Sequence, residues 1–467
     1  MTQNALLALD TIPSLAEIAR QIADTQHRIE HYLELTRRRD AVERIVNAFE
    51  LRDETCPIEV RGPLNGLPIS IKDQIAVAGW PRSFGLERCT KKVDDRSASL
   101  VTRLQALGAV VTGKTALPPH AMDFQTANVR RGPTRNPHDP AFTTGGSTGG
   151  GAAAVASGMS LLDVGADLSG SLRIPAAWCG VASYTPTEGL WPNDGLLPGK
   201  NCLDHFARFG LTARSVADLN TVWRLLEPSA GPEPKRATQP TVGVWSPADQ
   251  SPVDEDTLIA WREVETRLNA GGFQTETDSM GQLFDADVYR VGGEMIGYET
   301  GALIPWLIRW MMRRDKRAAD QSKGFIRHIH KGYRRSTDRH MECLEFLANH
   351  RTSAEASFER LDALLLPVTA ICAFRHILPV RDQGGVRSYD TVFETGAGPL
   401  GYFDALTQFT LPITVLGWPV VILRLGQDGN GLPIGAQLVG KPGADVQLLS
   451  LAAQLEAVLF QPVVPSE

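Results

Sequence analysis

Hydrophobic residues in the first fifty positions recur with the period of a helix. The repeating positions are Leu15, Ile18, Ile22, Ile29 and Leu33. Ser14 and Glu17 have the spacing of a capping box, in which a serine side chain caps the start of a helix. The pattern predicts a helical lead-in that packs on the protein through one apolar side.

From position 61 onward, short apolar runs alternate with glycine-rich turns and a helix of small residues. The apolar runs at 67–77, 109–112 and 161–164 are expected to be strands, and 152–157 is expected to be a helix. Alternation of strand, turn and helix is typical of an α/β fold. We therefore predict an α/β protein with a mixed, twisted sheet surrounded by helices.

The C-terminal part returns to strands. They are expected at 364–368, 420–425 and 432–439, and residues 427–431 have the composition of a hairpin turn. Strands at both ends, with helices between them, predict a single domain over residues 1–467. Its expected parts are a helical lead-in (1–60), a core (61–220), a variable helical segment on the substrate side (231–359) and strands with a helix that complete the sheet (360–467).

Composition mainly excludes classes of function. The formal net charge of −6 gives no reason to expect a nucleic acid or an anionic membrane as partner. The six cysteines lack metal-ligand spacing, so we expect reduced, mostly buried thiols and neither metal nor cofactor. No signal pattern and no run of about 18 apolar residues is present, which predicts a cytoplasmic protein.

Three residues stand where catalytic chemistry is plausible, although each alone is weak evidence. Lys72 lies in an apolar strand, and lysine is rarely buried unless it is paired. Ser147 lies in the glycine-dense stretch 143–151, and Ser171 ends the turn 165–171. By itself, a strand-end lysine usually reaches solvent, and a serine among glycines usually belongs to an ordinary turn.

Together, the three surroundings are specific. They read Gly-Leu-Pro-Ile-Ser-Ile-Lys-Asp, Gly-Gly-Ser-Thr-Gly-Gly and Asp-Leu-Ser-Gly-Ser-Leu-Arg-Ile-Pro-Ala. In this order and spacing, the chain resembles the amidase signature family of Ser–cis-Ser–Lys hydrolases. The resemblance runs from about 62 to 217 and resumes near 361–367 and 431–440. No family motif is found between about 231 and 359.

The resemblance implies a role for each of the three residues. Ser171 matches the nucleophile that becomes acylated, and Ser147 matches the bridging serine that follows a cis peptide bond, here after Gly146. Lys72 matches the neutral general base. A lysine accepts a proton near neutral pH only if burial lowers its pKa from about 10.4.

The resemblance also places an oxyanion hole in the turn before the nucleophile. Its expected donors are the backbone N–H groups of Leu168, Ser169, Gly170 and Ser171. Asp167 and Arg173 match residues that organise this turn, although an ordinary structural ion pair is the alternative. The chain departs from the family pattern at Ala166, Thr148 and Ser169, which leaves the catalytic groups in place and puts substrate specificity in doubt.

Other interpretations of the same residues stay open. Gly145-x-Ser147-x-Gly149 matches the nucleophile elbow of α/β-hydrolase esterases, although no strand directly precedes it and no histidine lies in a motif. A phosphate-binding loop would need a Gly-Lys-Ser/Thr continuation, which is absent. A catalytically degenerate binding subunit would not need all three relay residues.

The segment 296–345 is basic and aromatic. Its basic stretches, 309–317 and 323–339, suit an amidotransferase-type subunit that acts on charged tRNA with partner subunits, or simply a solvated helix face. Its apolar positions Trp306, Leu307, Trp310, Met311 and Met312 suit core packing or the wall of a pocket for a bulky substrate. Met122 and Gln125 are further candidates for that pocket.

These observations lead to one expected activity. We expect an amidohydrolase that cleaves carbon–nitrogen bonds of small molecules through a Ser171 acyl-enzyme. Aryl or bulky amides are the expected substrates, with carbamate (urethane) and ester cleavage as further activities. The expected partner is the small-molecule substrate alone, and the expected state is a monomer or homodimer.

Overall fold

The computed structural model describes most of the chain. The described residues are 13–53, 55–86, 93–197, 202–230, 239–245, 253–277, 281–314, 324–383, 386–396 and 398–459. Residues 231–238, at the start of the variable segment, lie outside them, as does Cys89.

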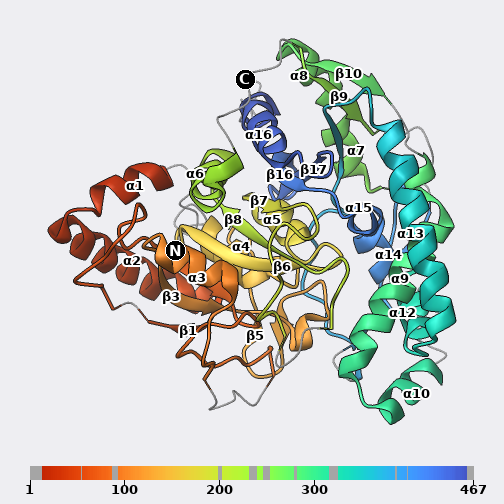
Figure 1. Ribbon diagram of the computed structural model, residues 1–467, viewed down its shortest axis with the longest axis horizontal. Helices are drawn as coiled ribbons and strands as arrows, with labels where there is room; N and C mark the ends of the chain where they lie inside the picture. Colours follow the sequence, from red (N-terminus) through yellow and green to blue (C-terminus); the bar gives the residue numbers. More distant parts are fainter. Residues whose placement is uncertain are drawn as a thin grey trace.

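One mixed sheet organises the molecule (Figure 1). Its eleven strands stand in the order β1-β3-β2-β6-β8-β7-β16-β17-β11-β9-β10. Their bounds are β1 (Phe49–Arg52), β2 (Pro68–Lys72), β3 (Val110–Thr115), β6 (Leu162–Asp167), β7 (Ala182–Thr185), β8 (Arg208–Ala213), β9 (Thr241–Val244), β10 (Gln274–Thr277), β11 (Ala363–Pro367), β16 (Val420–Gln427) and β17 (Pro433–Val439). Strands from both ends of the chain therefore meet in one sheet.

The central strands are buried on both faces. Every residue of β2, β6, β7, β8, β11 and β17 is buried. β2 runs parallel to both β3 and β6, whereas the strands from β6 to β11 pair antiparallel. Burial on both faces agrees with the continuous apolar run of β11, whereas β2 and β8 alternate apolar and polar residues although all of them are buried. The predicted α/β class with a mixed sheet surrounded by helices is confirmed.

Helices cover the sheet and extend beyond it. Their bounds are α1 (Leu15–Gln21), α2 (Thr25–Val46), α3 (Ser99–Ala106), α4 (Gly149–Ala156), α5 (Arg173–Cys179), α6 (Val216–Leu226), α7 (Glu255–Arg262), α8 (Val264–Ala270), α9 (Ala286–Thr300), α10 (Trp306–Arg314), α12 (Phe325–Gly332), α13 (Thr337–Ser357), α14 (Tyr402–Thr407), α15 (Thr410–Leu416) and α16 (Asp445–Leu459). In the described part of the chain, no helix is both long and apolar enough to cross a membrane.

Short 3-10 turns and three small hairpins complete the chain. The 3-10 turns are η2 (Pro119–Ala121), η3 (Pro228–Ala230), η5 (Gly281–Phe284) and η6 (Gly301–Leu303). The hairpins pair β4 (Ala127–Asn128) with β5 (Gly132–Pro133), β12 (Arg381–Gln383) with β13 (Val386–Ser388), and β14 (Val392–Phe393) with β15 (Leu400–Gly401).

The helices group by position in the sequence. α4 contacts β2, β6 and β8, and α5 contacts β7, β16 and β17, so the two helices that follow the glycine-rich turns lie directly on the sheet. α9 packs against α12, α13 and α15. Together with α10, these helices form a group beside the sheet, on the right in Figure 1. The variable segment therefore supplies the strands β9 and β10 at one edge of the sheet and most of the helices of this group.

The predicted helical lead-in forms, with one difference in its packing. The Ser14 side chain accepts a hydrogen bond from Glu17 N, 3.3 Å away, and so caps α1. Leu15 and Ile18 are buried, but Ile29 and Leu33 on α2 are 41% and 52% exposed. The prediction was wrong for these two residues because α2 packs through another side, which carries Tyr32, Leu35 and Arg39. There Arg39 donates from Nε to Met159 O and from Nη1 to Thr112 O.

Candidate active site

Lys72 ends β2 and points into the protein. Its side chain is 1% exposed, and Nζ donates hydrogen bonds to Ser147 Oγ at 2.7 Å and to Thr148 Oγ1 at 2.9 Å. Ala166 O lies 3.5 Å from the same nitrogen. Because these acceptors lie on the loop before α4 and on β6, the folded chain brings two of the three motifs together at this lysine.

The surroundings of Lys72 favour its neutral form. Burial lowers its pKa to about 7, although the charges of Asp167 and Asp163 act in the opposite direction. None of its three hydrogen-bond partners is charged. A substantial fraction of Lys72 is therefore unprotonated at neutral pH, as a general base requires.

Ser147 lies in a loop that permits no side chain before it. The Gly146–Ser147 peptide bond is cis. A Cβ on Gly146 would lie 2.7 Å from the backbone oxygen of Asp123, so only glycine fits there. The next residue, Thr148, donates its backbone N–H to Ser171 O at 2.9 Å. That hydrogen bond joins the glycine-rich loop to the turn that carries the third motif.

Ser171 lies between β6 and α5 and is 8% exposed. It lines the same cavity as Lys72 and Ser147. In the described part of the chain, no hydrogen bond joins its hydroxyl to Ser147, and none joins a histidine to either serine. Among the described residues, the elbow interpretation therefore lacks the histidine base that it requires.

Asp167 and Arg173 hold the turn in place. Both are buried, and Arg173 Nη2 lies 2.9 Å from Asp167 Oδ1. Burial alone would raise the pKa of Asp167, but the charge and hydrogen bonds of Arg173 and the N–H of Leu172 outweigh it and hold the pKa well below its usual range. Arg173 also donates to Thr410 O, Thr414 Oγ1 and Gln437 Oε1. The ion pair therefore ties the turn to the C-terminal helices and strands.

One expected donor of the oxyanion hole is occupied. The N–H of Gly170 donates to Asp167 Oδ1 at 2.8 Å, because the carboxylate sits inside the turn and collects its N–H groups. The expected role of Gly170 in the oxyanion hole therefore stays a prediction. In the described residues, the N–H groups of Leu168, Ser169 and Ser171 make no hydrogen bond, so these three stay available to a substrate oxygen.

Two buried carboxylates support the site and carried no signal in the sequence analysis. Asp163 Oδ1 accepts hydrogen bonds from Ser70 at 2.7 Å and Thr115 at 3.0 Å. Burial raises the pKa of Asp163 to about 6, while these hydrogen bonds and Lys72 oppose the rise. A Cβ on Gly151 would lie 2.0 Å from Asp163 Oδ2, which explains that glycine. An aspartate in the middle of an apolar strand was the available sign.

The second carboxylate, Asp123, fastens the C-terminal segment to the loop beside the site. It accepts from Tyr389 at 2.5 Å and Tyr402 at 2.9 Å, and Arg387 Nη1 lies 3.1 Å from it. Burial raises its pKa, against the charge of Arg387 and these hydrogen bonds. Because its partners lie more than 260 positions away, no local pattern in the sequence indicated this contact.

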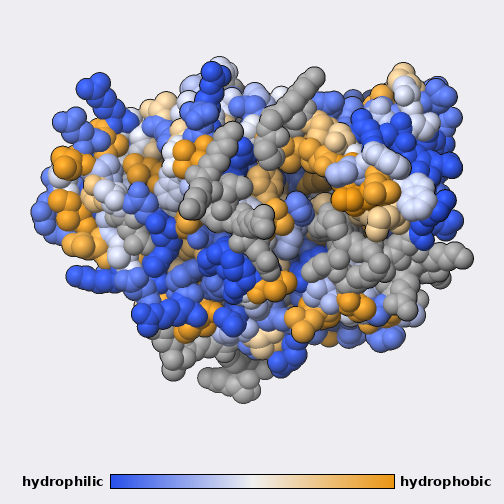
Figure 2. Space-filling view, turned by 90° about the horizontal axis from the view of Figure 1, so that it is seen from below, coloured by the Kyte–Doolittle hydropathy of each residue, from blue (hydrophilic) through white to orange (hydrophobic). Residues whose placement is uncertain are grey.

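A largely apolar cavity of about 580 Å³ opens above the three candidate residues. Its apolar lining includes Phe84, Leu86, Met122, Leu168, Leu196, Leu197, Leu203, Leu303, Ile304, Pro305 and Ile308. Figure 2 faces the side where α10 lies in Figure 1 and shows hydrophobic side chains around a hollow. The cavity therefore takes walls from η6 and α10 in the variable segment.

The structure places only one of the expected pocket residues at the cavity. Met122 lines the cavity, whereas Trp306, Trp310 and Met311 do not. These three lie on the exposed side of α10, with Trp306 69% exposed, because it is Ile308 of this helix that faces the cavity. Gln125 is buried elsewhere, where its amide exchanges two hydrogen bonds with the backbone of Ile377. The helical spacing of the apolar residues predicted an apolar side of the helix, but it did not show which side of α10 faces the cavity.

A second, smaller pocket of about 80 Å³ lies on another side of Ser171. It is lined by Ser169, Phe124, Ile296, Phe325, Ile326, Ile329 and Phe403, among others. Ser171 thus borders a large and a small apolar space. A bond attacked at Ser171 would extend into both.

We expect the charge of Asp163 to influence the pH at which amide turnover rises. Its negative charge raises the pKa of Lys72, so Asp163→Asn should move the midpoint of the rise in amide turnover to lower pH. The measurement is kcat/KM between pH 5 and 9. Asp40→Asn, an exposed change on α2, is the matched control and should not move the midpoint. A midpoint that stays in place or rises in Asp163→Asn would contradict this electrostatic link.

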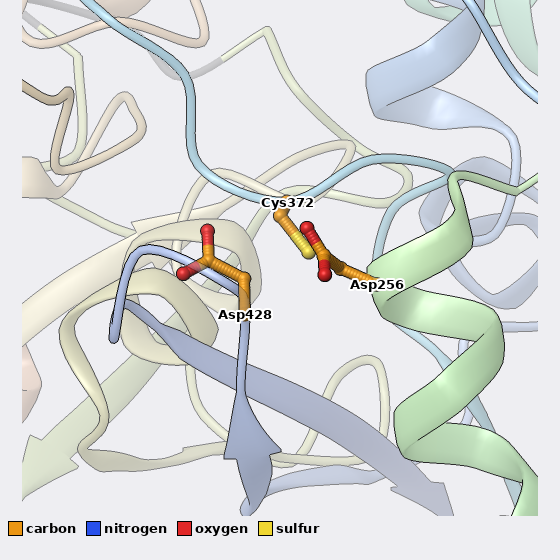
Figure 3. Close-up of side chains that lie close together, drawn as sticks. All are labelled: Asp256, Cys372 and Asp428. Atoms are coloured by element: carbon orange, nitrogen blue, oxygen red, sulfur yellow. The ribbon is translucent and has the colours of Figure 1, made fainter.

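One group of described side chains has the spacing of metal ligands, away from this site. Ligand atoms of Asp256, Cys372 and Asp428 lie within 4.8 Å of one another, and the side chains converge from α7, the loop after β11 and the β16–β17 turn (Figure 3). Asp428 Oδ1 accepts from two N–H groups of its own turn, and Asp256 accepts from Gly429 N. Burial and the neighbouring carboxylates raise the pKa of the Cys372 thiol, which keeps it protonated. The hydrogen bonds of the two carboxylates therefore stabilise the turn between β16 and β17.

Comparisons with known proteins agree with the geometry. Over 239 residues, about half of each chain, the protein is 36% identical to indoleacetamide hydrolase from Pseudomonas savastanoi. It is 29% identical to a glutamyl-tRNA(Gln) amidotransferase subunit of Deinococcus radiodurans, over 85% of this chain and 84% of that one. A solved structure described as an amidase superposes with a TM-score of 0.76 at 26% identity, covering 97% of this chain and 98% of the other.

The family itself is matched along most of the chain. The family described as Amidase matches residues 20–449, which include all three motifs and the variable helical segment that follows them. The resemblance noted from the motifs is therefore confirmed. The chain belongs to the Amidase family, whose members are hydrolases of carbon–nitrogen bonds.

Proposed function

We propose that this protein hydrolyses amide bonds of small molecules through an acyl-enzyme formed on Ser171. The observation that carries the proposal is the 2.7 Å hydrogen bond from buried Lys72 Nζ to Ser147 Oγ, in the cavity that Ser171 also lines. A base of pKa about 7 that contacts one serine beside another serine forms a relay for a proton.

The proposed reaction moves one proton in and out of Lys72. Ser171 Oγ attacks the carbonyl carbon while its proton passes to Ser147, and the proton of Ser147 passes to Lys72. The N–H groups of Leu168, Ser169 and Ser171 are the donors available to the resulting oxyanion. The carbon–nitrogen bond then breaks as the proton returns through Ser147 to the amine. Water, deprotonated by the same relay, releases the acid from Ser171.

The two spaces around Ser171 suggest which part of the substrate lies where. Lys72 and Ser147 line the larger cavity, and the leaving nitrogen must lie near them to receive the proton. A bulky apolar amine fits the space of about 580 Å³, whereas the space of about 80 Å³ suits a small acyl group. An aryl amide with a short acyl chain satisfies both conditions.

The name of the relative from Pseudomonas savastanoi states that it hydrolyses indoleacetamide, an aromatic amide whose ring lies on the acyl side of the carbonyl. This likeness supports an aromatic amide as substrate, and the cavity volumes alone support placing the ring on the amine side. A carbamate presents the same carbonyl with oxygen on one side, so we propose carbamate (urethane) cleavage as a second activity. Attack would expel the amine or the alcohol, and a carbamic acid formed in this way would lose carbon dioxide.

A substrate panel tests the proposal. We expect kcat/KM for an N-aryl acetamide to exceed that for acetamide by at least about ten-fold, because acetamide leaves the apolar cavity unfilled and burial of an aromatic ring contributes more than about 1.4 kcal/mol. An N-aryl carbamate should be turned over at a measurable rate. Leu303→Gln, which places a polar group in the cavity wall, should lower the aryl preference, and Leu307→Gln on exposed α10 is the matched control. If acetamide is the best of the three substrates, the assignment of the cavity is wrong, although the Ser171 mechanism survives.

A second candidate function follows from the likeness to the Deinococcus radiodurans protein. That protein is named as part of a glutamyl-tRNA(Gln) amidotransferase, and the likeness extends over 85% of this chain. Affinity purification at native expression level separates the two candidates. Free amide turnover by the purified single chain supports the small-molecule hydrolase, and activity that requires co-purified subunits and charged tRNA supports the amidotransferase.

A further inference from the structure

A second large cavity lies among the helices of the variable segment. It measures about 540 Å³, and its lining comes from α9, α10, α12, α13 and the loop between the last two. This size is within the range of cavities that hold small-molecule ligands. Unlike the cavity above Ser171, it is lined mainly by polar and charged side chains.

The charges around this cavity are strongly unbalanced. Five cationic side chains face one carboxylate: Arg313, Arg327, Lys331, Arg334 and Arg339 against Glu294. Glu294 is already paired with Arg339, whose Nε lies 2.7 Å from its Oε2. Within the described part of the chain, the other four cations form no ion pair with a carboxylate. The residues that line the cavity therefore carry a net positive charge, and Arg339 pairs with Glu342 as well as with Glu294.

The cations also repel one another. Partial burial lowers the pKa of Arg313, and the neighbouring charges of Arg334 and Arg314 lower it further. Beside the cavity, burial together with the charge of Lys331 lowers the pKa of His328 to about 4. Like charges that converge on a concave surface destabilise the empty cavity and favour a bound anion.

Two further features suit an anion. Ser336 lines the cavity and is the N-cap of α13, a helix of 21 residues whose positive end therefore lies at the cavity. Tyr298 and His340 also line it, with their rings stacked at 3.9 Å. Arginines bind phosphate oxygens in pairs of hydrogen bonds, which makes phosphate groups their preferred partners.

This cavity is separate from the cavity above Ser171. Glu294 and Tyr298 on α9 line the cationic cavity, whereas Ile296 and Thr300 line the spaces next to Ser171. Two positions along a helix correspond to about 200° of rotation, so the two sets lie on opposite sides of α9. α9 is thus part of the wall between the cationic cavity and the large cavity above Ser171, and His330 on α12 borders both the cationic cavity and the small pocket beside Ser171.

We propose that the cavity between α9, α10, α12 and α13 is a binding site for a small, multiply charged anion of the phosphate or polyphosphate class. The unpaired arginines supply charge-assisted hydrogen bonds, and the start of α13 supplies backbone N–H groups. The site is distinct from the amide site and does not depend on the role of Ser171.

The test is calorimetric titration of the full chain with inorganic pyrophosphate in a buffer of low ionic strength. We expect saturable binding that weakens as potassium chloride is added. The double variant Arg313→Gln/Arg334→Gln should raise the dissociation constant by about ten-fold or more. The matched control, Arg20→Gln/Arg44→Gln, removes the same charge from exposed positions on α1 and α2, far from α10 and α13 in Figure 1, and should bind as the parent does.

Two further measurements sharpen the outcome. Ser171→Ala should bind pyrophosphate unchanged, because the cavities are separate, and a loss of binding there would place the anion in the amide site and overturn the proposal. Titration with bulk tRNA tests whether the arginines bind the phosphate groups of a nucleic acid instead of a small anion. If tRNA binds and loses affinity in the Arg313/Arg334 double variant while pyrophosphate does not bind, the surface recognises nucleic acid and the small-anion site is refuted. Equal pyrophosphate affinity in the double variant and its control would refute it as well.

Discussion

Ser171→Ala is expected to abolish amide turnover and covalent labelling together. Ser171 borders both the large cavity with Lys72 and Ser147 and the small apolar pocket, so it is the group placed to attack a carbonyl that spans them. An alanine has no oxygen to acylate. A serine-directed fluorophosphonate should label the parent protein at this residue and leave the variant unlabelled, as intact mass and peptide mapping would report.

The controls for this experiment are two other hydroxyl residues. Ser183 is a buried serine on β7 whose hydroxyl has no hydrogen-bond partner among the described residues. Ser183→Ala should keep labelling and turnover and so excludes a general effect of removing a serine. Ser147→Ala should slow turnover by removing the bridge between Ser171 and Lys72. An adduct mapped to Ser147 in the parent protein would contradict the assignment and revive the nucleophile-elbow interpretation.

Lys72→Ala is expected to lower kcat by about 10²–10⁴-fold, the usual contribution of a positioned acid–base group. The lysine contacts Ser147 and Thr148 through Nζ and has no competing base in the relay. Lys72→Arg should be similarly inactive because a guanidinium stays protonated at all working pH values. His120→Gln changes a histidine that lines the same cavity and should lower kcat by less than about ten-fold.

The role of Lys72 as a base also predicts in which direction kcat/KM changes with pH. Only neutral Lys72 accepts the proton, so kcat/KM should rise with pH and reach half its maximum near the pKa of about 7. Below that pH the lysine holds its proton and turnover falls. A midpoint near about 10, the ordinary value for lysine, would show that the side chain is solvated. A histidine variant as inactive as Lys72→Ala would show that another base drives the reaction.

Much of the candidate site could be read from the sequence because its elements are local. The Lys72 motif lies on a strand, and the two serine motifs join a turn to the start of a helix, so the backbone of each unit depends mainly on its own glycines and apolar residues. Lys72 therefore ends β2, and Ser171 directly precedes α5, as their neighbours in the sequence indicate. The resemblance to a family then linked three local units that no periodicity could connect.

The substrate pocket was predicted less well, because periodicity says that a helix has an apolar side without saying what covers it. Trp306, Trp310 and Met311 belong to an apolar stretch, yet they lie on the exposed side of α10, and Ile308 faces the cavity. Met122 lines the cavity above Ser171, whereas the side chain of Gln125 forms hydrogen bonds with the backbone of Ile377. The direction of α10 depends on its packing against α12, which lies in the segment without family motifs.

The sequence by itself determined the α/β class, the three candidate catalytic residues and their order, because these depend on residue types within short segments. Tertiary structure alone decided the properties that arise from burial and from contacts between distant segments. The pKa of Lys72 falls because the sheet and α4 bury it, and Asp123 gains partners from the far end of the chain. The division of space around Ser171 and the cationic cavity behind α9 likewise exist only once helices from the variable segment pack against the sheet.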